Sequence, residues 1–240
     1  PNPEVPFGRE GEAFATMLSR PVKGLRIGWL GDWGGAYGCE AGIVGLCEAA
    51  VRVFEGLGAV VEAVAPPFPA AKLWQAWITL RAMMNAGAKG GLYADPAKRA
   101  MLKPETVWEI EQGMGLSAAA VHEASVIRSR WYARAARLFQ SYDALILPSA
   151  QVWPFPADWR WPERIAGRGM DTYHRWMEIV VPVSLAGLPC LNVPAGFGEA
   201  GLPMGMQIFG PTGADGKILA LGQAYHEATD WPGKRPPKLG

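Results

Sequence analysis

The sequence predicts an α/β fold, and three observations support this prediction. Short apolar runs of strand length, bounded by Gly and Pro, alternate with longer segments whose apolar residues recur at helical spacing. A chain of 240 residues is long enough to bury a substantial core, in one domain or two. Half of its residues are hydrophobic and 19% are charged, a composition that excludes a disordered chain.

The first predicted unit is a strand, a helix and a second strand. Leu25–Leu30 and Val60–Ala65 are apolar runs of strand length. The segment from about Glu40 to Leu57 predicts a helix, and Gly58 is suited to end it. The apolar face of this helix consists of Ile43, Leu46, Cys47, Ala50 and Phe54. Two strands joined by a helix predict a right-handed crossover and a parallel strand pair.

The middle of the chain is predicted to be mainly helical. The expected helices are Ala70–Ala88, Pro104–Met114 and a long helix that runs to Phe139 after Ser117 as its N-cap. One stripe of the long helix carries Val121, Ala124, Trp131, Ala135 and Leu138. The apolar run Ala144–Leu147 follows and has the length of a buried strand.

The last third of the chain begins with a loop rich in Trp and Pro, Gln151–Gly169, which is too long to serve only as a connection. The elements expected after this loop are a helix over Thr172–Leu185, strands over Cys190–Val193 and Gly205–Phe209, and a closing helix over Ala214–Ala228. Pro182 is expected to kink or end the regular part of its helix. The Gly- and Pro-rich turn between the two strands predicts a hairpin-like pair.

Four segments share their wording, order and spacing with a known family. They are Leu25–Asp32 (LRIGWLGD), Tyr142–Ser149 (YDALILPS), Ala186–Gly196 (AGLPCLNVPAG) and Gly201–Gly210 (GLPMGMQIFG). These segments resemble the amidase signature family, whose members are serine hydrolases that cleave carboxamides. The resemblance implies an α/β/α fold with a mixed central sheet flanked by helices. Residues 24–240 would form its C-terminal part, preceded by a linker segment over residues 1–23.

The part of the family pattern that carries the chemistry is missing from this sequence. The family's nucleophile motif is a Gly/Ser-rich stretch, roughly GGSSGGS, with a catalytic lysine upstream of it, and no such stretch occurs here. In the family, one serine attacks the amide carbonyl and a second serine relays its proton toward the lysine. The resemblance therefore implies that this chain has no catalytic residue of its own and is inactive alone.

The same resemblance implies a partner. We expect a C-terminal portion of a longer polypeptide, whose sheet normally pairs with strands from the N-terminal half of the same protein. A sheet edge left open in this way favours association or aggregation. Binding to that half, a homo-oligomer or poor solubility is therefore expected, and the small-molecule partner would be an amide substrate.

Five residues are candidates for the substrate-binding wall. Loops that leave the ends of sheet strands commonly carry ligand sites in α/β proteins. Trp153 and Phe155 lie on such a loop and are predicted to be pocket aromatics, although packing of the loop onto the core would also explain them. Tyr173, Trp176 and Ile179 lie at helical spacing on the next element, where a core-facing stripe is the alternative.

Other classes of chemistry find no support in the sequence. His122, His174 and His226 are widely spaced and form no HxH or HExxH motif, so no metal site is predicted. Neither a P-loop nor a dinucleotide fingerprint nor a GxSxG elbow occurs, and no cofactor is expected.

Charge and hydropathy exclude two further partner classes. A net charge of +1 without a basic helix face argues against nucleic acid, and no apolar run is long enough for a membrane helix. Three cysteines without a CxxC motif are typical of reduced thiols, which predicts a cytoplasmic protein.

Two alternatives remain for the function. One branch of the family is the A subunit of the tRNA-dependent amidotransferases. That branch carries a tyrosine cluster, RR…GxxxLSxGYYDAYY, before its second strand motif. The corresponding segment here, 103–139, lacks that cluster, which favours a free-standing amidase for a small, aryl or alkyl amide or a urea-like compound. Outside the enzymes, a non-catalytic module that binds a partner is the other alternative.

Overall fold

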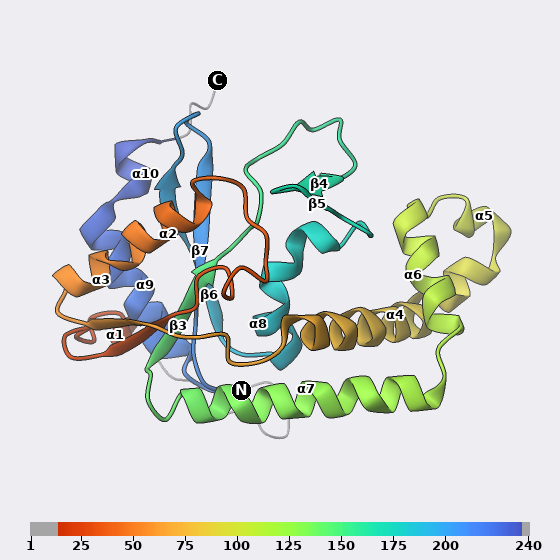
Figure 1. Ribbon diagram of the computed structural model, residues 1–240, viewed down its shortest axis with the longest axis horizontal. Coiled ribbons are helices and arrows are strands. Elements are labelled where there is room, and N and C mark those ends of the chain that lie inside the picture. The colour runs from red at the N-terminus through yellow and green to blue at the C-terminus, as the bar shows by residue number, and fades with distance from the viewer. Residues whose placement is uncertain (1–13, 237–240) are drawn as a thin grey trace.

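The computed structural model describes residues 14–236 and shows a five-stranded mixed sheet with helices on both faces (Figure 1). Residues 1–13 of the predicted linker segment lie outside the described residues. The strands of the sheet, in spatial order, are β2 (Val60–Ala63), β1 (Arg26–Trp29), β3 (Ala144–Pro148), β7 (Pro203–Phe209) and β6 (Cys190–Phe197). β1 is parallel to β2 and β3, whereas β7 is antiparallel to β3 and β6. The mixed sheet and the parallel β1–β2 pair are thus confirmed.

The helices follow the predicted order with a few additions. They are α1 (Phe14–Met17), α2 (Ile43–Val51), α3 (Val53–Gly56), α4 (Ala70–Ala94), α5 (Pro96–Arg99), α6 (Pro104–Met114), α7 (Ala118–Leu138), the 3₁₀ helix η1 (Arg175–Val180), α8 (Val181–Ala186), α9 (Asp215–Thr229) and α10 (Trp231–Lys234). A two-stranded hairpin, β4 (Arg164–Ile165) with β5 (Arg168–Gly169), lies apart from the main sheet. α4 and α7 run beside each other past the sheet and carry α5 and α6 at their far end (Figure 1).

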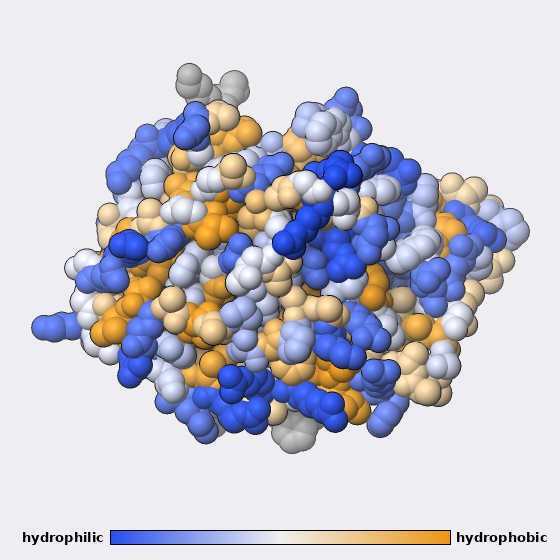
Figure 2. Space-filling model, in the orientation of Figure 1, coloured by the Kyte–Doolittle hydropathy of each residue, from blue (hydrophilic) through white to orange (hydrophobic). Residues whose placement is uncertain are grey.

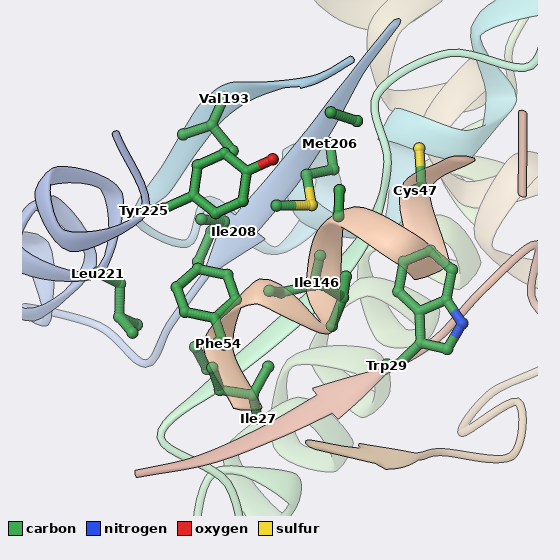
Figure 3. Close-up of a cluster of buried hydrophobic side chains, with 14 of the residues drawn as sticks. Ile27, Trp29, Cys47, Phe54, Ile146, Val193, Met206, Ile208, Leu221 and Tyr225 are labelled. Atoms are coloured by element: carbon green, nitrogen blue, oxygen red, sulfur yellow. The ribbon is translucent and has the colours of Figure 1, made fainter. Parts of the chain in front are cut away.

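The sheet is the middle of three layers. Successive side chains of a strand point to opposite faces, and helices cover both faces of this sheet. In β3, Ala144 and Ile146 join a core with residues of α2, α3 and α9. Leu145 and Leu147 join a second core with residues of α4, α7 and α8. Figure 3 shows the first core, in which Ile146 lies among side chains of β1, α2, α3 and β7. The α/β/α arrangement expected from the sequence is confirmed.

Two of the local sequence predictions are met closely. Ser117 caps α7, since its Oγ accepts a hydrogen bond of 3.1 Å from the backbone N–H of Ala120. Gly58 follows α3 with a φ of +86°, the left-handed conformation that glycine adopts without strain. Both residues set an element boundary where the sequence predicted one.

The helix expected from Glu40 to Leu57 needs correction. It begins only at Ile43, because Gly42 before it has a φ of +87°. It also divides at Arg52, whose carbonyl accepts from Glu55 in a tighter, i to i+3 pattern. The helix over Thr172–Leu185 is likewise a 3₁₀ segment followed by α8. Pro182 neither kinks nor ends a helix there but lies in the first turn of α8, where a missing N–H costs nothing.

Other differences concern element length. α4 continues to Ala94, six residues past its predicted end, through the helix-weakening glycines Gly90 and Gly91. β6 and β7 are each longer than expected, whereas β2 ends at Ala63 rather than Ala65. α1, α5, α10 and the β4–β5 hairpin had no counterpart in the prediction.

The surface of the described residues mixes hydrophobic and hydrophilic areas. On the face shown in Figure 2, hydrophobic side chains form several patches separated by hydrophilic ones. Within residues 14–236, no helix has both the length and the apolar character needed to cross a membrane. In the same range, no three His, Cys, Asp or Glu side chains are grouped as a metal ion would require.

Candidate functional site

An apolar hollow of about 530 Å³ lies beyond the end of β3, between the loop that follows this strand and the β6–β7 hairpin. The side chains and backbone that line it come from three places along the chain. They include Ser149, Trp153 and Phe155 from the loop, Trp176 from η1, and Asn192, Met204 and Gly205 from the hairpin. The hollow therefore forms at the carboxyl end of a central strand, where α/β proteins commonly bind ligands.

The end of β3 is fixed to the neighbouring strand β7. The backbone N–H of Ser149 donates to the carbonyl of Gly205 over 3.0 Å, and the side-chain amide of Gln207 donates to the carbonyl of Pro148 over 2.9 Å. A Cβ atom at Gly205 would lie 2.8 Å from the Oγ of Ser149. Glycine at this position therefore keeps the floor of the hollow open while the two strands stay in register.

Trp153 is held in place by the segment that leads into α2. Its backbone N–H donates to Oε2 of Glu40 over 2.8 Å, and its indole N–H donates to the carbonyl of Ala41 over 3.1 Å. The ring packs directly on Gly198, where a Cβ atom would come within 2.5 Å of the indole. These contacts fix the orientation of the ring in the wall of the hollow.

Phe155 and Trp176 also line the hollow, and their rings contact each other. Their ring centroids are 5.4 Å apart in a T-shaped arrangement, a favourable geometry for two aromatic rings. The indole Nε1 of Trp176 is buried and has no hydrogen-bond partner among the described residues. This N–H has almost no accessible surface, so Trp176 contributes its aromatic ring rather than its N–H to the lining of the hollow.

The structure brings together three of the five predicted wall residues: Trp153, Phe155 and Trp176. Tyr173 instead lines a separate depression of about 290 Å³, with Trp108 and Trp161. Ile179 is fully buried in the core on the α4 side of the sheet, as its core-facing alternative predicted. Tyr173 and Ile179 therefore do not line this hollow, and their prediction as wall residues is corrected.

Sequence reasoning missed several residues of the site. Asn192 and Gly205 lie on neighbouring strands, and the one polar residue in the apolar run Cys190–Val193 was a signal for the first of them. Glu40 was predicted only as the start of a helix. Nothing in the local pattern indicates that its carboxylate reaches the loop more than a hundred residues later.

Gln151 connects the elements around the hollow. It is almost fully buried, and its side-chain amide donates to the carbonyl of Gly38 over 3.0 Å. The amide oxygen accepts from the backbone N–H of Ile179 over 3.1 Å, and its backbone carbonyl accepts from Glu40 over 2.8 Å. One buried amide thus joins the β3 loop, η1 and the segment before α2, as buried polar groups require partners.

A buried charged cluster supports η1 from the side of α4 and α6. Glu109 is 3% exposed and pairs with Arg81, and its Oε1 lies 3.0 Å from Nε2 of His174, although that ring N–H is not aligned with it. Trp77 and Tyr173 contact the His174 ring edge to face. Two residues after Trp176, burial raises the pKa of Glu178, and the nearby Arg175 offsets this only in part.

The Glu109 cluster makes stability depend on pH. Burial disfavours the charged carboxylate, but His174 and Arg81 outweigh it and hold the pKa of Glu109 below its ordinary value. Since the folded pKa is lower than the unfolded one, the stabilisation is present above the unfolded pKa. It is lost as the pH falls through the folded pKa. We expect the Tm of the wild-type chain to fall more steeply below about pH 5 than that of Glu109→Gln.

Thermal melts across this pH range by differential scanning fluorimetry measure the effect. Glu163→Gln changes an exposed carboxylate and serves as the matched control, which should follow the wild-type curve. Parallel curves for wild type and Glu109→Gln would show that Glu109 contributes no acid-sensitive stability.

The lining of the hollow suits binding rather than catalysis. Among the described residues that line it, the polar side chains are those of Ser149 and Asn192, and no histidine, lysine or carboxylate is present. A serine hydroxyl is a weak nucleophile unless a base activates it. The hollow therefore offers apolar walls and neutral hydrogen-bonding groups without a nucleophile and base pair.

The curated relatives that this chain matches include A subunits of glutamyl-tRNA(Gln) amidotransferase. The A subunit of glutamyl-tRNA(Gln) amidotransferase from Bordetella avium is 28% identical over 246 residues, which cover 96% of this chain and 48% of that protein. The protein of the same name from Lactiplantibacillus plantarum is 29% identical over 256 residues, covering 95% and 49%. The chain thus spans about half the length of the curated relatives it matches.

Solved structures with the same fold include amidase signature enzymes. A bacterial aryl acylamidase of the amidase signature family is 25% identical with a TM-score of 0.84, over 96% of this chain and 50% of that one. The glutamyl-tRNA(Gln) amidotransferase A subunit from Thermotoga maritima is 22% identical with a TM-score of 0.60, over 86% and 43%. The family model described as Amidase matches residues 2–219. With its sheet order, its layers and this match along most of its length, the chain belongs to the amidase signature family.

Proposed function

We propose that this chain is the scaffold and substrate-binding portion of an amidase, which hydrolyses a carboxamide to a carboxylate and ammonia or an amine. The observation that carries the proposal is the aromatic hollow at the end of β3, which has neutral polar groups but no base among its described lining residues. The nucleophilic serine, its proton relay and the lysine would come from a polypeptide segment with the Gly/Ser-rich motif. Alone, the chain would be inactive, and a cytoplasmic location stays a prediction.

The lining supports an uncharged substrate with an aryl or alkyl group. Trp153, Phe155 and Trp176 supply apolar surface, and a fixed charge on the substrate would find no counter-charge among the described residues of the hollow. The amide of Asn192 and the hydroxyl of Ser149 would bind the neutral polar end of the substrate. An acyl-serine would form when the serine attacks the amide carbon and the amine leaves, and water would then release the carboxylate.

A glutamine-dependent role is the second candidate, because the curated relatives named above are amidotransferase A subunits. In that role the amide substrate would be glutamine and the ammonia would pass to a partner protein. The higher TM-score to the aryl acylamidase and the missing tyrosine cluster in residues 103–139 support the free-standing amidase instead. An α-amino acid would also bring two charges into a hollow whose described lining is uncharged.

Ammonia release from benzamide and from glutamine by the full-length protein tests the proposal. Trp176→Ala should lower kcat/KM for benzamide by about tenfold or more, since it removes an aromatic wall of the hollow. Trp108→Ala removes an equal side chain outside the hollow and should change kcat/KM less than about threefold. A preference for glutamine, or equal effects of the two substitutions, would contradict the proposal.

A further inference from the structure

A second hollow lies next to the one described above. Its volume is about 490 Å³, and its walls come from the segment that opens α2 and from the β6–β7 turn. The residues that line it are Ala41, Gly42, Leu46, Trp153, Phe197, Gly198, Glu199, Ala200 and Leu202. Among the described residues of this lining, Glu199 is the one that carries a charge, and it lies on the exposed turn. The second hollow is therefore as suited to an apolar group as the first.

Trp153 is the one residue of the described chain that lines both hollows. The first hollow extends from it toward Phe155, Trp176 and the end of β3, and the second toward Leu46 and Phe197. Trp153 is therefore shared by two apolar spaces of nearly equal size. Removal of its side chain would open one space toward the other and roughly double the volume available to an apolar group.

The Trp153 ring packs against two residues without a side chain, Gly42 and Gly198, which both line the second hollow. A Cβ atom at Gly198 would overlap the six-membered part of the indole, and one at Gly42 would contact its edge at 3.7 Å. The hydrogen bonds to Glu40 and Ala41 hold the backbone and the indole N–H, respectively. The orientation of the Trp153 ring is therefore fixed, because the backbone N–H and the indole N–H of Trp153 both have hydrogen-bond partners.

We propose that Trp153 is a specificity-determining residue that limits how long an apolar substituent the hollow accepts. The inference rests on the proposed function, because it assigns the first hollow to the apolar group of an uncharged amide. With Trp153 in place, an aryl group or a short alkyl chain fills the first hollow and a longer chain meets the indole. Without the ring, a longer arylalkyl amide would extend into the space between Leu46 and Phe197.

Binding of an amide series to the 240-residue chain tests this assignment without requiring turnover. Isothermal titration calorimetry with benzamide, 3-phenylpropanamide and 6-phenylhexanamide gives a Kd for each compound. For the wild type we expect no gain in affinity from the second compound to the third. For Trp153→Ala we expect 6-phenylhexanamide to bind more tightly than 3-phenylpropanamide, by about fourfold for each methylene that becomes buried.

Two further variants keep the result interpretable. Trp153→Phe retains a ring on Gly198 and should give a smaller gain for the longest amide, even if the alanine variant folds poorly. Adding Leu202→Trp to Trp153→Ala refills the second hollow from its opposite wall and should cancel the gain. Circular dichroism establishes that each variant is folded before titration.

The possible outcomes separate the two proposals. A length-dependent gain in the Trp153 variants that Leu202→Trp cancels would support the assignment. Equal affinities for the two longer amides in every folded variant, with benzamide still bound, would overturn the role of Trp153 and leave the amide site standing. Failure of the wild-type chain to bind any of the three amides would overturn the amide site itself, and the role of Trp153 with it.

Discussion

Replacing Trp131 with alanine is expected to lower the free energy of unfolding by about 3–5 kcal/mol. Trp131 is fully buried in the layer between α7, α8 and the sheet. Its ring contacts Trp33 at a centroid distance of 5.6 Å, and its indole N–H donates to the carbonyl of Pro182 over 2.7 Å. The substitution therefore leaves a large cavity and a buried carbonyl without its donor.

The adjacent residue provides a matched control for this prediction. Tyr132 lies on the same helix but is 42% exposed, and its hydroxyl contacts Thr212 at the surface. Tyr132→Ala should cost about 1 kcal/mol or less. Chemical denaturation monitored by circular dichroism gives both values. A similar loss for the two variants would mean that α7 does not pack on the sheet through Trp131.

Gly113→Ala is expected to destabilise the chain by about 1–3 kcal/mol, because α6 crosses α4 with no room for a methyl group. A Cβ atom at Gly113 would overlap the carbonyl oxygen of Ala82 and lie 2.7 Å from the Cβ of Ala86. Since the overlap is with backbone, the two helices must move apart. Glu109 lies one turn earlier on α6, so its contacts with Arg81 and His174 would be disturbed as well.

Gly91→Ala is the matched substitution on the partner helix, with the opposite expected sign. A Cβ atom at Gly91 would meet nothing within 4 Å, and the residue lies within α4. Alanine should therefore raise the free energy of unfolding by about 0.5–1 kcal/mol through its better helix propensity. Stabilisation by both substitutions in the same denaturation experiment would contradict the close α4–α6 crossing.

Much of the fold could be predicted because local signals and tertiary contacts agree. Ala144–Leu147 is apolar throughout and is a central strand buried on both faces, and Ser117 caps the helix that it was expected to begin. Predictions failed where packing overrides propensity. α4 continues through Gly90 and Gly91 because α6 and α7 pack along it.

The candidate site was predictable in part. The position of Trp153 and Phe155 after a buried strand was sufficient to place both at the hollow. Periodicity alone did not separate Trp176, which lines the hollow, from Ile179, which lies in the core. A regular 3₁₀ helix would place residues three apart on one face, but η1 is broken at Met177, between Trp176 and Ile179, so the common face that helical spacing predicted is lost. Contacts between distant segments, such as that of Glu40 with Trp153, leave no local pattern.

We propose that this chain binds the amide and that the nucleophile comes from another segment. Ammonia release from benzamide locates the nucleophile when it is measured for the 240-residue chain alone and for the chain joined to an amidase segment with the Gly/Ser-rich motif. We expect no turnover by the chain alone, and turnover by the joined protein that Trp176→Ala reduces. Ammonia release by the purified chain alone, sensitive to Trp176→Ala, would overturn the proposed function and place a nucleophile within these 240 residues.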